Sequence, residues 1–253
     1  MKKKSPTTVP KHKDMDKEHA YEMYISTHFG KARKNIKREF DLYYRLFKKN
    51  YSSLLPKDKG ANILDIGCGM GHFLYYLKKG GYKNISGLDV SRENAEFCRK
   101  NGFNIACKDG RTFLKPQKEK YDVIVMNDVI EHLDKGEIFE MLSMIHSALK
   151  KGGTVMVKTP NMANPLCVHS RYIDFTHEVG FTEESLSQAL RVSGFREVFV
   201  YPLDIYVKKN PLFNMIGKLA FWFQNTVLKL LFIANGRIST RIFTKSILAV
   251  GRK

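Results

Sequence analysis

Three glycines at alternate positions follow a short apolar run and mark the first place where this chain could bind a ligand. The run Asn62–Ile66 predicts a buried strand, and the residues from Met70 to Lys79 predict a helix. Between them, Gly67, Gly69 and Gly71 permit a sharp turn and close approach of a ligand. The helix N-terminus adds free N–H groups and a positive dipole end. Together these features predict a nucleotide-type pocket at the carboxyl end of a parallel sheet.

Two carboxylates flank this turn in the sequence. Asp89 ends the next apolar run, where a carboxylate could accept hydrogen bonds from both hydroxyls of a ribose, or could instead cap the following helix. Asp65 lies two residues before the first glycine and could accept a hydrogen bond within the loop or, through water, from an amino group of the ligand. The spacing G-x-G-x-G differs from the G-x-G-x-x-G fingerprint of dinucleotide-binding proteins, which disfavours NAD.

Two histidines could act as a general base near neutral pH, because histidine titrates there. His132 follows the apolar run that ends at Asn127, and His177 lies in a polar segment where Asp174 or Glu178 could orient it. A structural hydrogen-bonding role remains open for either histidine. Asp174, His177 and Glu178 match no standard ligand spacing, so we predict no metal site.

The segments Asp65–Gly71, Gly87–Asp89 and Asn127–Leu133 together resemble the class I S-adenosylmethionine (SAM)-dependent methyltransferases. The likeness is to the branch that includes ubiquinone-pathway O-methyltransferases and many sugar and polyketide methyltransferases, and it covers about residues 60 to 200 plus a last strand. It implies SAM as cofactor, with its methionine part over the glycines, its adenine amino group at Asp109, and the transferred methyl beside residues 129–133. An ordinary turn is the alternative role for Asp109. The cofactor-binding residues that the resemblance implies are Asp65, Gly67, Cys68, Gly69, Gly71, Phe73, Asp89, Val90, Asp109, Gly110, Asn127, Asp128 and Val129.

Strand and helix patterns alternate along the chain, which predicts an α/β fold. We expect a Rossmann-like, mostly parallel seven-stranded sheet with helices on both faces, an N-terminal helical cap and a helical insertion before the last strand. Ser91 and Thr182 are expected helix N-caps. The expected strands are near 61–66, 84–89, 103–106, 121–127, 153–159, 196–202 and 244–250, and the expected core helices near 71–79, 91–101, 134–150 and 182–193.

We interpret residues 1–253 as one domain in four parts. A basic tail and helical cap (1–53) precede the SAM-binding core (54–204), a basic apolar insertion (205–242) and the last strand (243–253). The loop 158–165 is expected to line the acceptor pocket. Tyr21, Tyr24, His28 and Arg33 in the cap could reach SAM or the acceptor or only pack, and Arg171 and Tyr172 could grip a phosphate or sugar.

The net charge of +18 is concentrated at the two ends of the chain. Residues 1–50 carry 14 basic and 6 acidic side chains, residues 51–204 carry 20 and 19, and residues 205–253 carry 9 and none. Basic ends could bind nucleic acid, an anionic membrane or a phosphorylated substrate, or could only keep the surface solvated. Four scattered cysteines and the lack of a signal-peptide pattern predict a cytoplasmic protein, with peripheral membrane contact an option.

The insertion from 212 to 234 predicts one long helix or two. Asn214, Lys218, Asn225 and Lys229 form a narrow polar stripe that includes Trp222, and nearly everything else is apolar. This pattern fits an interfacial membrane helix, a helix that covers the core, or a dimer interface. An apolar run of about 18 residues without interruption is lacking, so a simple transmembrane helix is not expected.

These observations favour an enzyme that methylates a hydroxyl of a small molecule, a sugar or a lipid-linked glycan intermediate. Amine-methylating DNA and RNA enzymes carry a Pro-Pro motif where this chain has Asn127-Asp128-Val129-Ile130, which disfavours that chemistry. The alternatives are an RNA methyltransferase, for which we see no RNA-binding module, and a non-catalytic SAM-fold protein at a membrane surface. The sequence leaves the oligomeric state open.

Overall fold

The structure, a computed structural model, describes residues 36–205, 207 and 210–253. The predicted tail and first cap helix, with Tyr21, Tyr24, His28 and Arg33, lie outside these residues. Seven strands of the described chain form one sheet in the order β3-β2-β1-β4-β5-β7-β6. Only β7 runs antiparallel to its neighbours, which confirms the mostly parallel sheet. The strands are β1 Asn62–Ile66, β2 Asn84–Asp89, β3 Ile105–Cys107, β4 Tyr121–Asn127, β5 Leu149–Pro160, β6 Arg196–Pro202 and β7 Ser246–Arg252.

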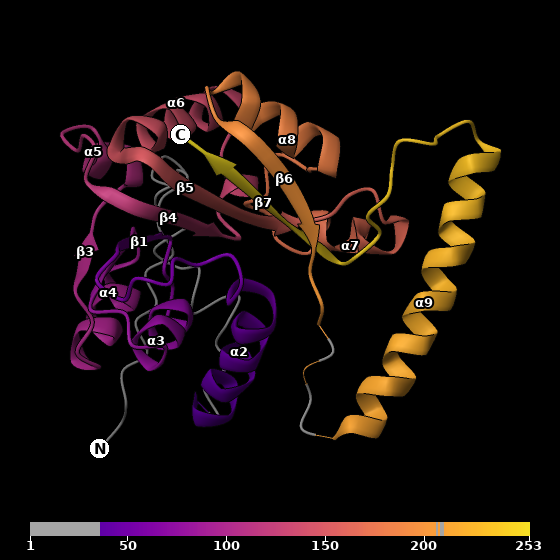
Figure 1. Cartoon of the computed structure of the whole chain (residues 1–253), viewed down its shortest axis with the longest axis horizontal. Coiled ribbons are helices and arrows are strands. Elements are labelled where there is room, and N and C mark those ends of the chain that lie inside the picture. The colour runs from indigo at the N-terminus through magenta and orange to yellow at the C-terminus, as the bar shows by residue number, and fades with distance from the viewer. Residues whose placement is uncertain (1–35, 206, 208–209) are drawn as a thin grey trace, which may run out of the picture.

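Helices cover both faces of this sheet, as expected (Figure 1). The helices α2, α3 and α4 lie on one face, and α5, α6 and α8 lie on the other. The described helices are α2 Ile36–Tyr51, α3 His72–Lys79, α4 Arg92–Lys100, α5 Gly110–Leu114, α6 Lys135–Ala148, α7 Val168–Tyr172, α8 Glu183–Val192 and α9 Pro211–Ala234, with short 3-10 turns η3 Ile130–His132 and η4 Pro165–Cys167.

Alternation along the central strands divides the core into two layers. In β4, Ile124 and Met126 face α5, α6 and α8, whereas Val123 and Val125 face α2 and α3. All four side chains are buried. Because successive side chains of a strand point to opposite faces, a strand covered on both sides must be apolar throughout. This central strand ends at Asn127, where the polar residues of the candidate site begin.

Local signals explain most of the helix boundaries. Ser91 accepts a hydrogen bond from the Asn94 N–H, and Thr182 forms a capping box with Ser185, so both predicted N-caps are confirmed. Gly81 and Gly102, which follow α3 and α4, have φ of +84° and +73°. This left-handed conformation ends a helix with little strain only at glycine or a few polar residues.

Several predicted boundaries were wrong. The helix expected to reach residue 150 ends at Ala148, and β5 begins at Leu149 rather than at 153. Tyr121 pairs with Leu149 but Val123 pairs with Thr154, so the first part of β5 contains a bulge, in which Gly152 has φ of +74°. The third strand begins at Ile105 rather than at 103. The short helices α5 and α7 were not predicted.

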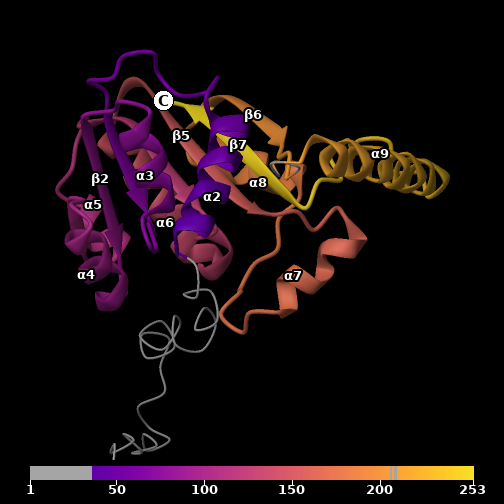
Figure 2. The same cartoon turned by 90° about the horizontal axis from the view of Figure 1, so that it is seen from below.

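The insertion forms one long helix, α9, which stands apart from the rest of the molecule (Figure 1 and Figure 2). Leu228 is its only buried side chain in the described structure. The interpretation of this segment as a cover over the chain's own core is therefore wrong. By length and composition alone, α9 is apolar enough to cross a membrane, contrary to our expectation from the interrupted apolar run.

Candidate functional site

The glycine loop joins β1 to α3 at the carboxyl edge of the sheet. Gly67, Gly69 and Gly71 have φ of +66°, +52° and +80°, so the backbone requires glycine at each position. At Gly69 a Cβ atom would have no described atom within 4 Å, which leaves space for a ligand. At Gly67 it would lie 2.4 Å from Val129 Cγ2, and at Gly71 3.0 Å from Cys98 Sγ. Close packing, rather than ligand access, therefore explains two of the three glycines.

Asp65, the last but one residue of β1, and Asn127, the last residue of β4, lie on adjacent parallel strands beside this loop. Asp65 is 1% exposed, and its Oδ1 has no hydrogen-bond partner in the part of the chain described here. Burial raises the pKa of Asp65 well above its usual range, and Asp89 raises it further. Asn127 Oδ1 accepts a 2.5 Å bond from the Tyr51 hydroxyl, while Asn127 Nδ2 lacks a partner among the described residues.

Unpartnered buried polar atoms are rare because each costs about 1–3 kcal/mol. An amino group and a carboxylate, as in the methionine part of SAM, would supply partners for Asp65 and Asn127 respectively. These two residues therefore fit the cofactor that the sequence predicts.

Asp89 braces the glycine loop. Its Oδ2 accepts a 2.8 Å bond from the Gly69 N–H, and its Oδ1 accepts bonds from the Ser91 N–H and Asn94 Nδ2 at 2.9 and 3.2 Å. Burial raises the pKa of Asp89, although the N–H groups of Ser91 and Gly69 oppose this effect. Two carboxylate oxygens offer about four acceptor sites, so the capping role leaves room for a ribose hydroxyl. Ribose binding stays a prediction.

The remaining predicted cofactor residues differ in whether their side chains are accessible to a ligand. Asp109 accepts bonds from the Arg111 and Thr112 N–H groups, both 3.1 Å, and so caps α5; contact with adenine stays a prediction. Val90 is 48% exposed at the same edge. The side chains of Cys68 and Phe73 are buried among apolar neighbours, which leaves only their main chains for a ligand. A Cβ at Gly110 would lie 2.8 Å from Met141 Cε, so this glycine serves packing.

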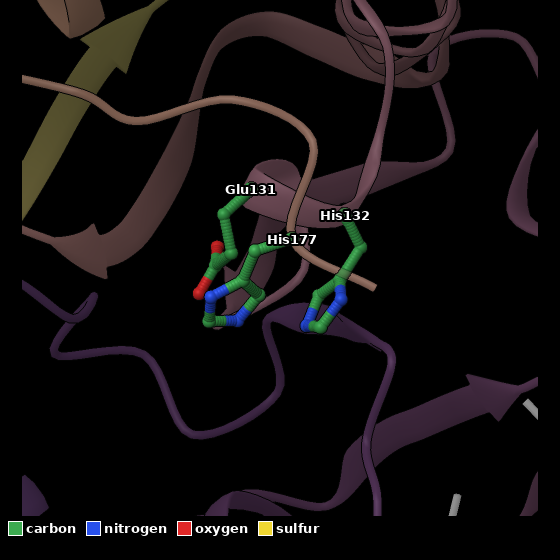
Figure 3. Close-up of side chains that lie close together, drawn as sticks. All are labelled: Glu131, His132 and His177. Atoms are coloured by element: carbon green, nitrogen blue, oxygen red, sulfur yellow. The ribbon is translucent and has the colours of Figure 1, made fainter. Parts of the chain in front are cut away.

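Glu131, His132 and His177 converge after β4 (Figure 3). Their side chains point to the same side, and one ligand-type atom from each lies within 4.8 Å of the others. His132 and Glu131 belong to the turn η3, whereas His177 comes from the loop between α7 and α8. The structure thus brings together both predicted histidines and adds a glutamate that the sequence reasoning missed.

A hydrogen-bonded series fixes the ring of His132. The Thr176 hydroxyl donates its proton to Asp174 Oδ1 at 2.7 Å, so His132 Nδ1, 2.8 Å from the same oxygen, must donate to it. The lone pair of neutral His132 therefore lies on Nε2. Asp174 thus reaches His132 through Thr176, and the expectation that Asp174 or Glu178 orients His177 stays a prediction. His177 Nδ1 instead donates to the Ser170 carbonyl at 2.8 Å, which places its lone pair on Nε2 as well.

Burial controls the charge of this cluster. It lowers the pKa of His132 to about 4, with His177 as the second cause. It also raises the pKa of Glu131 to about 8, and the charge of Asp128 adds to this rise. Glu131 Oε2 accepts a 3.0 Å bond from the Thr159 hydroxyl, and Oε1 has no partner among the described residues. Two imidazoles and a carboxylate could hold a divalent cation, so Glu131, His132 and His177 are candidate metal ligands. The sequence-based prediction that this chain binds no metal stays a prediction.

A second polar group lies between the strand ends and α2, where the charges of Lys158 and Asp128 act on Tyr43. Asp128, with φ of +56°, forms an ion pair with the ammonium group of Lys158 on β5. His72 lies between the rings of Phe40 and Tyr43, with centroid distances of 4.5 and 4.3 Å. Burial lowers the pKa of His72 to about 4, so its 3.3 Å contact with Glu39 is not an ion pair at neutral pH.

The predicted acceptor loop is held by the chain that follows α9. Asn161 Nδ2 donates to the Ile242 and Thr244 carbonyls, and Asn164 Nδ2 donates to the Phe243 carbonyl at 2.7 Å. Arg171, expected to grip a phosphate, donates to the His177 and Glu178 carbonyls. Tyr172 is 77% exposed and remains a candidate for acceptor binding.

The family profile described as "Methyltransferase domain" matches residues 36–198, which is more than half of the chain. This chain belongs to the class I SAM-dependent methyltransferases. A solved structure of a SAM-dependent methyltransferase from Archaeoglobus fulgidus superposes with a TM-score of 0.63 at 24% identity, over 86% of this chain and 98% of that one. That similarity shows the fold, and membership of the family gives SAM as the cofactor.

The curated relatives include enzymes named for different acceptors. Phosphoethanolamine N-methyltransferase 3 of Arabidopsis thaliana is 28% identical over 163 residues, which are 59% of this chain and 32% of that protein. Ubiquinone biosynthesis O-methyltransferase of Pelagibacter ubique is 30% identical over 107 residues, which are 41% of this chain and 43% of that protein. The chain thus matches less than half of the length of these relatives, and they leave oxygen and nitrogen acceptors open.

Proposed function

We propose that this methyltransferase transfers the methyl group of SAM to a hydroxyl. The observation that supports an oxygen acceptor is the lone pair on His132 Nε2, fixed by Thr176 and Asp174 at the carboxyl edge of the sheet. A hydroxyl loses a proton when it is methylated, whereas a neutral amine can attack without a base. A histidine held neutral and in one tautomer suits the first reaction.

When bound, SAM supplies an electrophilic methyl group on a sulfonium sulfur. The chain's own part is to align the acceptor hydroxyl with that carbon and to take its proton on His132 Nε2. The new O–CH3 bond replaces the S–CH3 bond, and the imidazolium returns its proton to water. Glu131, when ionised, would stabilise that imidazolium across the cluster.

The proposed acceptor is a small molecule, a sugar or a lipid-linked glycan, handled in the cytoplasm. The core from 51 to 204 carries almost no net charge, which supports such an acceptor over RNA. All four cysteines are unpaired, consistent with a reducing compartment.

Titration calorimetry with S-adenosylhomocysteine and with NAD tests the cofactor first. We expect binding of the former only, and no binding by the folded protein would contradict catalysis. Radiolabelled SAM then tests acceptors that offer only a hydroxyl or only an amine. Product mass spectrometry should show an ether, and His132→Gln should reduce its formation about a hundredfold or more, the range of general-base effects. An N-methylated product formed equally well by His132→Gln would overturn the oxygen assignment.

A further inference from the structure

Helix α9 presents a broad apolar surface to its surroundings. More than half of the side-chain surface is exposed at Leu212, Ile216, Leu219, Trp222, Phe223 and Leu230. At 100° per residue these positions share one side of the helix. The side turned to the body carries Asn225 and Leu228, and it contacts the body where Phe232 lies 4.9 Å from the Phe243 ring. The outward side thus needs an occupant that accepts an apolar face.

The charges of α9 border this surface. Lys218 and Lys229 are its only charged residues, and eleven residues, or about three turns, separate them, so both lie on one edge of the helix. Lys218 Nζ lies 3.4 Å from Asp204 Oδ2, which fixes this edge toward the body. An apolar face with lysines along its border is typical of a helix that lies in a membrane interface, where long basic side chains reach the headgroups.

The topology of the sheet favours a helix in the membrane plane over one that spans the bilayer. The insertion leaves β6 and returns to β7, and Pro202 at the end of β6 pairs with Ile247 at the start of β7. Both ends of α9 are therefore tied to one place on the sheet. A spanning helix would require residues 203–210 or 235–245 to recross a hydrocarbon core about 30 Å thick as non-helical backbone, which lipid does not tolerate.

The segment 235–245, which leads from α9 back to β7, is also folded against the protein. Phe243 and Thr244 are buried, and the carbonyls of 242–244 accept bonds from Asn161 and Asn164. It also contains Arg237 and Arg241, both exposed to solvent. Both are basic groups close in sequence to the end of α9 that the headgroups of an anionic membrane would attract.

Charge decides between a membrane and a second copy of this chain. Residues 205–253 contain nine basic and no acidic side chains. Two copies paired through α9 would bring the like charges of Lys218, Lys229 and the neighbouring Arg237 together, whereas an anionic bilayer complements them. We propose that α9 docks in the plane of an anionic membrane surface, with its apolar side at the acyl boundary and its lysines among the headgroups.

Docking in this way would bring the candidate site to the membrane. The carboxyl edge of the sheet holds the glycine loop and His132, and the same edge holds the end of β6 and the start of β7, where Ser246 pairs with Pro160. The segment before α9 is tied to the site as well, because Asn50 Nδ2 donates to the Asp204 carbonyl and Asn50 Oδ1 accepts from its N–H. This geometry would suit an acceptor that is linked to a lipid. The inference about the acceptor rests on the proposed function, whereas the inference that α9 docks on a membrane does not.

Flotation of the full chain with vesicles tests the docking. We expect binding to phosphatidylcholine vesicles that contain phosphatidylglycerol, and much weaker binding to phosphatidylcholine alone. Leu219→Glu with Phe223→Glu should weaken binding at least about tenfold, because it replaces two large apolar side chains of the outward face with charges. The matched control, Val192→Glu with Phe199→Glu, adds the same charge at positions that are 67% and 58% exposed elsewhere, and should bind as the parent does.

Two results would overturn the proposal. One is absence of vesicle binding by the parent chain. The other is an oligomer in light scattering that the Leu219/Phe223 variant dissociates, without vesicle binding, which would make a second copy the occupant. S-adenosylhomocysteine binding, measured on every variant, should be unchanged, and it separates failure of docking from failure of the proposed function.

Discussion

Asp89 shows how one carboxylate can serve both the loop and a ligand. It accepts three bonds from the chain, one of them from Gly69 in the centre of the glycine loop. We predict that Asp89→Ala weakens S-adenosylhomocysteine binding about 10- to 100-fold, the value of one or two hydrogen bonds to a charged group. Calorimetry measures this effect, and circular dichroism checks the fold. A second variant, Asp109→Ala, tests the predicted contact with adenine separately. If Asp89→Ala binds S-adenosylhomocysteine as tightly as the parent does, Asp89 does not contact the cofactor.

The Thr176 hydroxyl links Asp174 to His132 by hydrogen bonds, and the sequence reasoning missed this link. We predict that Thr176→Val lowers kcat about tenfold or more while the affinity for S-adenosylhomocysteine stays the same, because the variant loses the acceptor that holds His132 Nδ1–H. Thr176→Ser retains the hydroxyl and should restore the rate. The measurement is kcat as a function of pH with an identified acceptor. Equal rates for all three proteins would show that His132 needs no such positioning.

At the scale of elements, helix α2 covers one face of the sheet and also holds Asn127, a residue of the candidate site, in place. The Tyr51 hydroxyl, buried in the last turn of α2, donates to Asn127 at the end of β4. We predict that Tyr51→Phe lowers the free energy of unfolding by about 1–3 kcal/mol, because it leaves a buried amide oxygen without its donor. Denaturant unfolding measures this loss. Tyr201→Phe on the partly exposed strand β6 is the control, and we expect it to change little.

The contact between α2 and α3 should also make stability depend on pH. Burial of His72 lowers its pKa to about 4, below the usual 6.5, so the unfolded chain binds more protons between these two values. Its contribution to stability is complete above about pH 6.5 and is lost as the pH falls toward 4. We predict that His72→Phe, which keeps an aromatic ring between Phe40 and Tyr43, flattens the fall of Tm from pH 7 to pH 5. A Tm that falls equally in both proteins would assign the effect to other groups.

Sequence reasoning succeeded where the signal is local. The glycines, Ser91 and Thr182 are read from spacings of a few residues, and the structure confirms the turns and caps that they imply. The Asx cap of Asp109 could have predicted α5, but five residues give too little periodicity. The bond from His132 to Thr176 joins residues 44 positions apart, and Glu131 became a candidate only when the fold placed His177 beside it. An apolar pattern could not say what α9 faces, because burial depends on the whole molecule.

At the scale of the whole molecule, α9 is an addition that the sheet hardly needs. It buries one side chain, Leu228, and it rests on Phe243 through Phe232. Residues 242–244 are held by Asn161 and Asn164 independently of the helix. We therefore predict that replacing residues 211–236 with a short Gly-Ser linker costs about 2 kcal/mol, from the apolar surface newly exposed, and lowers Tm by about 5 °C.

The same variant tests whether docking and cofactor binding are separate properties of the chain. Because the hydrogen bonds from Gly69 to Asp89 and from Tyr51 to Asn127 involve no residue of 211–236, S-adenosylhomocysteine should bind the shortened protein with the parent's affinity. Vesicle binding should disappear, since the apolar face is gone. If transfer to a water-soluble hydroxyl acceptor then continues while transfer to a lipid-linked one is lost, the helix delivers the site to its acceptor rather than shaping the chemistry. Loss of cofactor binding in a folded variant would instead show that α9 supports the core.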